Sequence, residues 1–348
     1  MLVQKTITML SLVLWQIPNQ PSDPDSACKK EAYDSDSLQC VSQNKETANH
    51  ALYQAHLYDI TGGFLFDPGH CDYASGQMSL SVDADRCGCD FVSSYEQSRL
   101  PIMREVERSV LGCDYGGTSW TTRVQADGIA KILNLQAGVN HLDVGSGSGW
   151  PALFLARSSG CDVTLVDIPM IALSLANQRV AEEGLDNQCR AIVASGAALP
   201  FAAGAFDSLS HSDVLCCLPE KMEMLQECRR VVRSQAAMLF TVISISPGLA
   251  QADYAQAVEA GPPFIEAPAE YSQMVRESGW RIIGRQDVTA DFAVSLRTLV
   301  ATMTARADEI AAAIGADELL EQKQHRQSQI LAVEKGLLKR EIFHCLAV

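Results

Sequence analysis

The sequence has few positive charges and no long hydrophobic run near its start. Lys and Arg total 27 against 42 Asp and Glu, giving a formal net charge of −15, and the basic residues do not cluster. An extended nucleic-acid surface needs clustered Lys and Arg for its phosphate contacts, so we expect no nucleic-acid partner. The apolar stretch Ile7–Trp15 is too short to span a bilayer, and no small-residue cleavage site follows it. We therefore expect no membrane partner and a cytoplasmic protein.

Cysteine, by contrast, is plentiful: the chain holds 12. Disulfide frameworks are typical of small secreted domains, whereas a chain of 348 residues, 47% of them hydrophobic, can bury a full core without cross-links. We expect most of the thiols to be reduced. A candidate metal group is formed by His70, Cys71, Cys87 and Cys89, but their spacing is not an established zinc pattern, so no metal is expected.

The first part of the chain lacks a periodic pattern. Residues 16–50 are rich in Ser, Asp, Asn, Gln and Pro, and such a stretch buries too little apolar surface to offset its ordering entropy. We expect residues 1–97 to form an N-terminal extension, partly disordered, and residues 98–348 to form one domain. Within this domain we expect a cofactor-binding core, a helical lid insert and a final strand at residues 138–246, 288–336 and 338–346.

From residue 98 onward, helical and strand patterns follow one another. Apolar stripes with helical spacing predict two helices at residues 98–111 and 122–133. Short apolar strands, separated by helical patterns, are then predicted at residues 141–144, 162–166, 189–194, 206–210 and 237–245. Such alternation is typical of a parallel sheet that is covered by helices on both faces.

The end of the chain changes this pattern. A helix at residues 268–278 is followed by a strand at 280–285, a long helical stretch at 291–335 and the final strand. This order predicts an antiparallel hairpin that completes the sheet, with helices inserted between its two strands. The expected fold class is therefore α/β, a doubly wound, mostly parallel seven-stranded sheet with an N-terminal extension and a helical lid insert.

The first predicted strand runs into a glycine loop, Asp143–Gly149, with the order Asp-x-Gly-x-Gly-x-Gly. Its glycines let the backbone turn sharply and approach a ligand with no Cβ in the way. Dinucleotide enzymes use G-x-G-x-x-G instead, so the spacing disfavours an NAD(P)-dependent dehydrogenase. The second strand ends at Asp167, 24 residues after Asp143, where an acidic residue accepts hydrogen bonds from ribose hydroxyls in Rossmann-like folds.

A family resemblance is carried by four stretches: Leu142–Gly149, Val163–Asp167, Leu199–Phe201 with Phe206-Asp207, and Asp213–Leu215 leading into Arg229–Val231. On these stretches residues 140–245 resemble the Rossmann-fold (class I) S-adenosylmethionine-dependent methyltransferases, specifically the type 11-like, small-molecule branch. The end of the chain is similar in layout to the methyltransferases of glycine, sarcosine and related small acceptors. The resemblance implies an enzyme with S-adenosylmethionine as its cofactor and a small molecule as its substrate.

The same resemblance implies which residues hold the cofactor. Asp143 and the loop glycines would hold the methionine part, and Asp167 the ribose. For the adenine, Ser195 stands where the family often has Asp; its hydroxyl can still accept that hydrogen bond, and the Gly196 N–H can serve the ring nitrogen. The expected cofactor contacts are Asp143, Gly145, Gly147, Gly149, Asp167, Ile168, Ser195 and Gly196.

Residues outside this core are candidates for the acceptor side. Tyr115 and Trp120 bound an aromatic segment that closes over the cofactor in relatives, a plain surface loop being the alternative. His211 follows the fourth strand and is the candidate catalytic base, unless it is a hydrogen-bonded core histidine. Asp213 lies at the same sheet edge. Cys216, the first of two adjacent cysteines, either belongs to a thiol-handling surface or packs a tight turn.

The sequence thus predicts an S-adenosylmethionine-dependent methyltransferase that acts on a small molecule, with nitrogen or sulfur favoured as the nucleophile. An amine or thiol needs only to lose a proton, whereas a hydroxyl normally needs a base, so small-molecule O-methylation is the alternative. An alternative of another class is a catalytically inactive scaffold protein that binds the cofactor without turnover.

Overall fold

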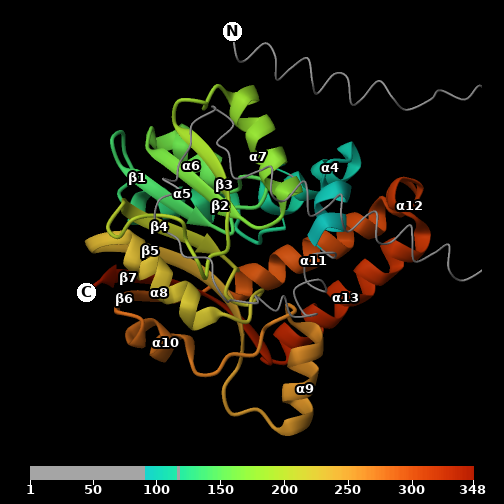
Figure 1. Cartoon of the computed structure of the whole chain (residues 1–348). Helices are drawn as coiled ribbons and strands as arrows, with labels where there is room; N and C mark the ends of the chain where they lie inside the picture. The colour runs from blue at the N-terminus through green and yellow to red at the C-terminus, as the bar shows by residue number, and fades with distance from the viewer. Residues whose placement is uncertain (1–90, 116–117) are drawn as a thin grey trace, which may run out of the picture. The chain divides into compact units, whose positions relative to one another are not determined.

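The computed structural model describes residues 91–115 and 118–348, whose centre is a seven-stranded sheet (Figure 1). The strand order in the sheet is β3-β2-β1-β4-β5-β7-β6. The strands are β1 Asn140–Val144, β2 Asp162–Asp167, β3 Cys189–Val193, β4 Phe206–Ser212, β5 Val232–Ile245, β6 Trp280–Asp287 and β7 Leu338–Ala347.

Only β7 runs against the other strands. β1 pairs in parallel with β2 and β4, β3 continues the parallel ladder on one side, and β5 continues it on the other. β7 pairs antiparallel with both β5 and β6, from Ala237 opposite Leu346 to Ile245 opposite Leu338 on the β5 side. These pairings confirm the expected α/β fold, a mostly parallel sheet of seven strands closed by an antiparallel hairpin.

Helices cover both faces of the sheet and bury two separate apolar cores. Along β5, Met238 and Phe240 belong to one core while Leu239 belongs to the other, because neighbouring side chains of a strand point to opposite faces. One core is formed with α5 Arg123–Ile132, α6 Ala152–Ser159 and α7 Met170–Glu183. The other core is formed mainly with α8 Lys221–Val231, α9 Gln251–Ala260, α10 Tyr271–Glu277 and the first helix of the insert. The fold is therefore doubly wound.

Local sequence signals set several of the helix ends. Thr122 caps α5, since its hydroxyl accepts the Gln125 N–H and the Gln125 side chain accepts the Thr122 N–H in a capping box. Gly184 closes α7 in the left-handed conformation, with φ of 68°. The α5 cap matters for the site because it fixes the residues just before the helix.

Between β6 and β7 lies a helical insert of three helices, residues 289–334: α11 Thr289–Ala305, α12 Ala307–Ile314 and α13 Ala316–Glu334. It has its own apolar cluster with α4 Pro101–Leu111, made by Val106, Met303, Ile310 and Leu319. In Figure 1 these orange and red helices lie beside the blue-green α4, although nearly two hundred positions separate them in the chain.

The element boundaries differ from the sequence expectation in several places. α9 was not predicted, because its buried residues are the alanines Ala257 and Ala260 and it has no stripe of large apolar side chains. β5 begins at Val232 and not at residue 237, and α10 begins at Tyr271 and not at residue 268. The long helical stretch expected at 291–335 is divided into three helices, at Arg306 and at Gly315.

Some expectations concern parts of the chain that the structure does not describe. His70, Cys71, Cys87 and Cys89 lie outside the described residues, as does most of the predicted N-terminal extension. Within residues 91–115 and 118–348, no group of three or more His, Cys, Asp or Glu side chains is arranged to hold a metal ion. In the same part of the chain, no helix has the length and apolarity that a membrane crossing requires.

None of the seven described cysteines forms a disulfide. Six of them are buried and Cys217 is half-buried; the buried six are Cys113, Cys161, Cys189, Cys216, Cys228 and Cys345. Burial raises the pKa of the Cys189 and Cys345 thiols to about 12, because the thiolate would lose its hydration. These side chains therefore act as small apolar residues that pack the two cores.

We predict that reductant leaves the fold of this part intact. Adding a phosphine reductant should move the melting temperature by less than about 1 °C, because no cross-link among these seven thiols restricts the unfolded chain. Alkylation of the denatured protein followed by peptide mapping should find all seven thiols modified without prior reduction. A fall of several degrees, together with disulfide-linked peptides from these positions, would contradict the assignment.

Candidate active site

A cavity of about 400 Å³ opens at the edge of the sheet where β1, β2 and β4 end. Its wall is built by the loops that follow these strands, residues 144–148, 167–169 and 212–220, together with residues 194–196 after β3. Tyr95 and residues 118–120 line it from outside the sheet. In open α/β sheets the carboxyl ends of parallel strands form the ligand crevice, and this cavity occupies that place.

The glycine loop comes close to its neighbours at two positions that admit no side chain. Gly145 has φ of 69°, and a Cβ on it would lie 2.3 Å from a methyl group of Val214. Gly147 has φ of 54°, and a Cβ there would lie 2.6 Å from the Tyr95 hydroxyl oxygen. Both the backbone conformation and the close contacts require glycine, so the loop presents bare backbone to the cavity. Gly149 packs its backbone against Leu153 of α6 instead.

Asp167 closes the loop from the end of β2. One carboxylate oxygen accepts the Gly147 N–H at 2.7 Å and the other accepts the Ile168 N–H at 2.8 Å. Burial raises the pKa of Asp167, although the two backbone donors act in the opposite direction. The carboxylate lines the cavity, and Ile168 borders the opening with 64% of its surface exposed.

Asp143 lies beneath the loop and is not among the described residues that line the cavity. It is 2% exposed, and the Ser210 hydroxyl donates to its carboxylate at 2.5 Å. The same Ser210 contacts the His141 ring at 2.9 Å, so the three side chains form one buried chain between β1 and β4. Burial raises the pKa of Asp143 to about 7. Its carboxylate supports the loop from below.

Ser195 and Gly196 line the side of the cavity next to Asp167. The Ser195 hydroxyl accepts the Ala197 N–H at 3.2 Å, which holds the turn after β3. A Cβ on Gly196 would lie 2.9 Å from the Val144 side chain, so the chain passes close to the end of β1 here. The segment predicted to cover the adenine therefore faces the same cavity as the glycine loop.

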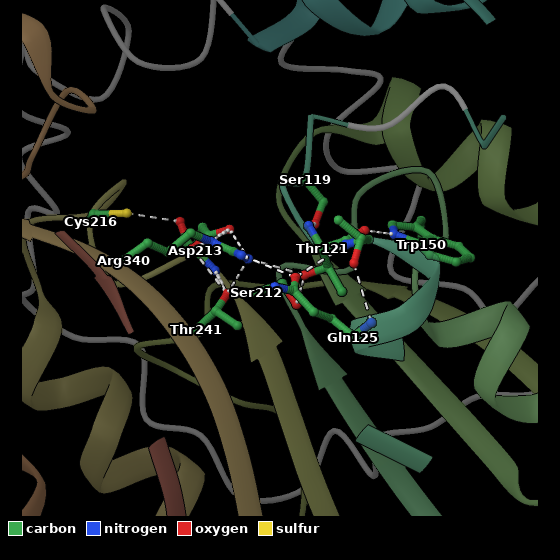
Figure 2. Close-up of polar contacts among 10 residues, drawn as sticks. Ser119, Thr121, Gln125, Trp150, Ser212, Asp213, Cys216, Thr241 and Arg340 are labelled. Atoms are coloured by element: carbon green, nitrogen blue, oxygen red, sulfur yellow. Dashed lines mark hydrogen bonds and ion pairs between the residues drawn. The ribbon is translucent and has the colours of Figure 1, made fainter. Parts of the chain in front are cut away.

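Figure 2 shows a buried polar network at the end of β4. Asp213 has φ of 57°, in the left-handed region, and its carboxylate receives two nitrogens of Arg340, Nε at 3.0 Å and Nη2 at 2.9 Å. The Thr241 hydroxyl donates to the same carboxylate at 3.0 Å. Arg340 also donates to Gln125 and Thr121 at the start of α5. The Asp213 carboxylate is thereby held in an ion pair and hydrogen-bonded within the protein, so it is not free to act as a base.

The other sequence candidates for the acceptor side separate into two groups. Trp120 and Cys216 line the cavity, and the Cys216 thiol donates to the Asp213 carbonyl at 3.1 Å. Tyr115 lies in a core instead, with its ring 5.2 Å from Trp150 and its hydroxyl donating to Glu183 at 2.9 Å. Tyr115 therefore does not line this cavity.

His211 points into the interior. Its side chain is 1% exposed, neither ring nitrogen has a hydrogen-bond partner, and the ring stacks on Phe240 at 4.7 Å. Burial lowers its pKa to about 3, because an imidazolium there would have no water and no counter-ion. The ring is neutral at physiological pH and has no path to an acceptor.

Several cavity residues were missed by the sequence reasoning, among them Tyr95 and Phe264. Tyr95 lies in a segment without clear periodicity, yet its hydroxyl lies over Gly147 and 3.5 Å from Thr118. Phe264 follows the unpredicted α9, and its N–H donates to the Cys216 carbonyl at 3.1 Å. No local pattern marks either residue, since both reach the cavity through tertiary packing.

The comparisons with known proteins agree with this geometry. Residues 142–240 match the family described as a methyltransferase domain. Methyltransferase GfsG of Streptomyces halstedii is 29% identical over 45% of this chain and 58% of its own length. The glycine/sarcosine/dimethylglycine N-methyltransferase of Actinopolyspora halophila is 25% identical over 63% of this chain and 39% of its own. The chain thus spans only part of the length of these relatives.

A solved structure shows the same fold. Phosphoethanolamine N-methyltransferase 2 of Haemonchus contortus, in complex with S-adenosylhomocysteine, superposes with a TM-score of 0.62 over 74% of this chain and 60% of its own, at 16% identity. The family match covers the glycine loop, Asp167 and the end of β4, which are the segments that build the cavity. Residues 142–240 are therefore identified as similar to a methyltransferase domain, and the fold around them is that of the Rossmann-like methyltransferases.

Proposed function

We propose that this protein is an enzyme that transfers the methyl group of S-adenosylmethionine to a small-molecule acceptor. One observation carries the proposal: a single cavity joins the bare backbone of the glycine loop and the Asp167 carboxylate to an apolar wall that contains Trp120 and Cys216. The first part suits a nucleoside linked to an amino acid. The second part leaves a surface against which an acceptor can lie.

The residues present fit the cofactor. Ser146 and Ser148 are buried loop residues that line the cavity, and neither hydroxyl has a hydrogen-bond partner within the protein. Buried polar groups in folded proteins are nearly always paired, so two orphaned hydroxyls beside a backbone cradle indicate a polar ligand. In this proposal the loop backbone and its serines hold the methionine part. Asp167 holds the ribose, and Ser195 with Gly196 borders the adenine.

Asp143 has an indirect role in this assignment. Burial raises the pKa of Asp143 to about 7, so its side chain, held by Ser210 below the loop, supplies negative charge only in its ionised form, which a nearby cofactor carrying an ammonium and a sulfonium would favour. Asp167 adds to that charge from the side. Opposite charges in a site of low dielectric attract strongly, so the two carboxylates favour a cationic cofactor over a diphosphate.

When bound, the cofactor would supply a methyl group on a sulfonium: the carbon–sulfur bond would break as the acceptor's lone pair bonds to the carbon, and the sulfur would keep the bonding pair as a neutral thioether. The protein's part is to align the acceptor and to exclude water. Trp120 and the residues after β4 perform this role by forming a continuous wall beside the loop.

Nitrogen or sulfur remains the favoured acceptor atom. Asp213 is neutralised by Arg340, and His211 has no access to the cavity. An amine with a free lone pair, or a thiol that ionises near neutral pH, needs no positioned base. O-methylation would need a positioned base. Among the described residues on the acceptor side of the cavity, the exposed Glu220 carries the remaining carboxylate that could serve as this base.

We predict that Asp167→Asn weakens S-adenosylhomocysteine binding by roughly 10- to 150-fold, because a charge-assisted hydrogen bond is worth about 1.5–3 kcal/mol. Isothermal calorimetry on both proteins measures the change. Asp162→Asn is the matched control, since Asp162 begins the same strand at its opposite end, and its affinity should stay within about twofold of the unchanged protein. Equal affinity of Asp167→Asn and the control would remove Asp167 from the cofactor site.

We further predict that Trp120→Ala lowers methyl transfer at least about tenfold while S-adenosylhomocysteine affinity changes by less than about threefold. Trp120 borders the acceptor part of the cavity and makes none of the loop contacts. Transfer of radiolabelled methyl groups over a panel of amines, thiols and alcohols measures the first quantity and calorimetry the second. Ile283→Ala, which removes an exposed side chain from β6, is the control. Comparable loss of cofactor affinity in Trp120→Ala would place the acceptor elsewhere.

A further inference from the structure

The part of the cavity away from the glycine loop has a distinctive lining, which we call the apolar wall: Trp120, Val214, Cys216, Leu218, Ile243, Pro262 and Phe264. Its residues come from three loops and from β5, so no single sequence motif encodes it. Apart from the indole N–H of Trp120, these side chains offer a ligand apolar surface, and the Cys216 thiol already donates to the Asp213 carbonyl.

The polar groups beside the apolar wall are already paired within the protein. Asp213 is paired with Arg340 and accepts a hydrogen bond from Thr241, as described above. The Lys221 ammonium donates to the Leu218 carbonyl at 2.7 Å and to the Phe264 carbonyl at 2.6 Å. Two of the three ammonium N–H groups are thus taken by backbone carbonyls, and Lys221 is 2% exposed and is not among the described residues that line the cavity.

These same contacts make the apolar wall rigid. Lys221 ties the loop after β4 to the loop after α9, and the Phe264 N–H donates to the Cys216 carbonyl between the same two loops. A surface that is fixed before the ligand arrives costs little ordering entropy on binding. The apolar wall is therefore selective for molecules whose shape fits it without rearrangement.

The charges of the cavity are all negative. Among the described residues that line it there is no Lys, Arg or His, whereas three carboxylates occur, those of Asp167, Asp213 and Glu220. Arg326 of α13 lies 5.3 Å from the Trp120 ring centroid, but it is not a lining residue and it donates to Gln329. A carboxylate or phosphate on the acceptor would lose its hydration in this cavity without gaining a cation.

From this lining we infer that the acceptor is an uncharged, predominantly apolar molecule, and neither a zwitterionic amino acid nor a phosphate ester. The inference rests on the proposed methyl transfer, because it assigns the apolar wall to the acceptor of that reaction. It separates this chain from relatives whose names specify glycine, sarcosine or phosphoethanolamine, since those ligands carry a carboxylate or a phosphate.

The experiment compares four probes that share one ring and differ in charge: benzyl alcohol, benzoate, benzylamine and phenylglycine. Each is titrated into the full-length protein saturated with S-adenosylhomocysteine, and binding is followed by ligand-observed NMR. We expect benzyl alcohol to bind at least about tenfold more tightly than the other three, because it alone carries no charge into the cavity. Phe264→Ala and Leu218→Ala should each weaken benzyl alcohol binding about fivefold or more and leave S-adenosylhomocysteine affinity within about twofold.

Ile283→Ala, an apolar truncation on the exposed surface of β6, is the control and should change neither affinity. If benzoate or phenylglycine binds as tightly as benzyl alcohol, and this affinity is lost in Arg326→Gln, the inference is overturned in favour of an anion site at Arg326. If benzylamine binds most tightly of the four probes, and this affinity is lost in Glu220→Gln, the inference is overturned in favour of a cationic acceptor. Absence of binding by all four probes would also overturn it.

The proposed function fails in a different way. If S-adenosylhomocysteine itself does not bind in calorimetry, the cofactor assignment is wrong before any acceptor probe is added. If the cofactor binds and the probes rank as expected, turnover of apolar thiols and of weakly basic aromatic amines that are uncharged at the assay pH, over glycine and phosphoethanolamine, with radiolabelled S-adenosylmethionine, completes the support.

Discussion

The buried ion pair between Arg340 and Asp213 holds together the segments on which the site depends. Arg340 is near the start of β7, the one reversed strand, and Asp213 follows β4 in the parallel part of the sheet. β5 lies between them and contributes Thr241 to the same network (Figure 2). Removing one member of such a pair leaves an uncompensated buried charge, which typically costs about 3–5 kcal/mol.

Arginine suits this position better than lysine would. Its planar fork donates to the Asp213 carboxylate in two directions and still reaches Gln125 and Thr121 at the start of α5. A lysine ammonium is a point charge and cannot span these acceptors at once. The guanidinium thus fixes the residue after β4 relative to the segment that carries Trp120. Two sides of the cavity are set by one side chain that does not line it.

The same network determines the chemical character of the cavity. Neutralising Asp213 leaves a site with carboxylates on the cofactor side and apolar side chains on the other. Net negative charge near the loop favours a cationic ligand, and in the proposed reaction the apolar wall would favour desolvation of the methyl group being transferred. The two sides of the cavity differ because some of the polar side chains beside it are paired within the protein. The sequence shows these residues only as polar and does not reveal the pairing.

The sequence by itself determined the doubly wound sheet, the glycine loop and the acid at the end of β2. These features are local: alternating apolar segments, glycines where φ is positive, and a carboxylate at a strand end. Tertiary structure alone decided the rest. It placed His211 and Tyr115 in cores and Asp143 below the loop, and it brought Tyr95 and Phe264 to the cavity. Each of these outcomes depends on which face of an element is covered and by which distant segment, and contacts between distant segments leave no periodic signal in the chain.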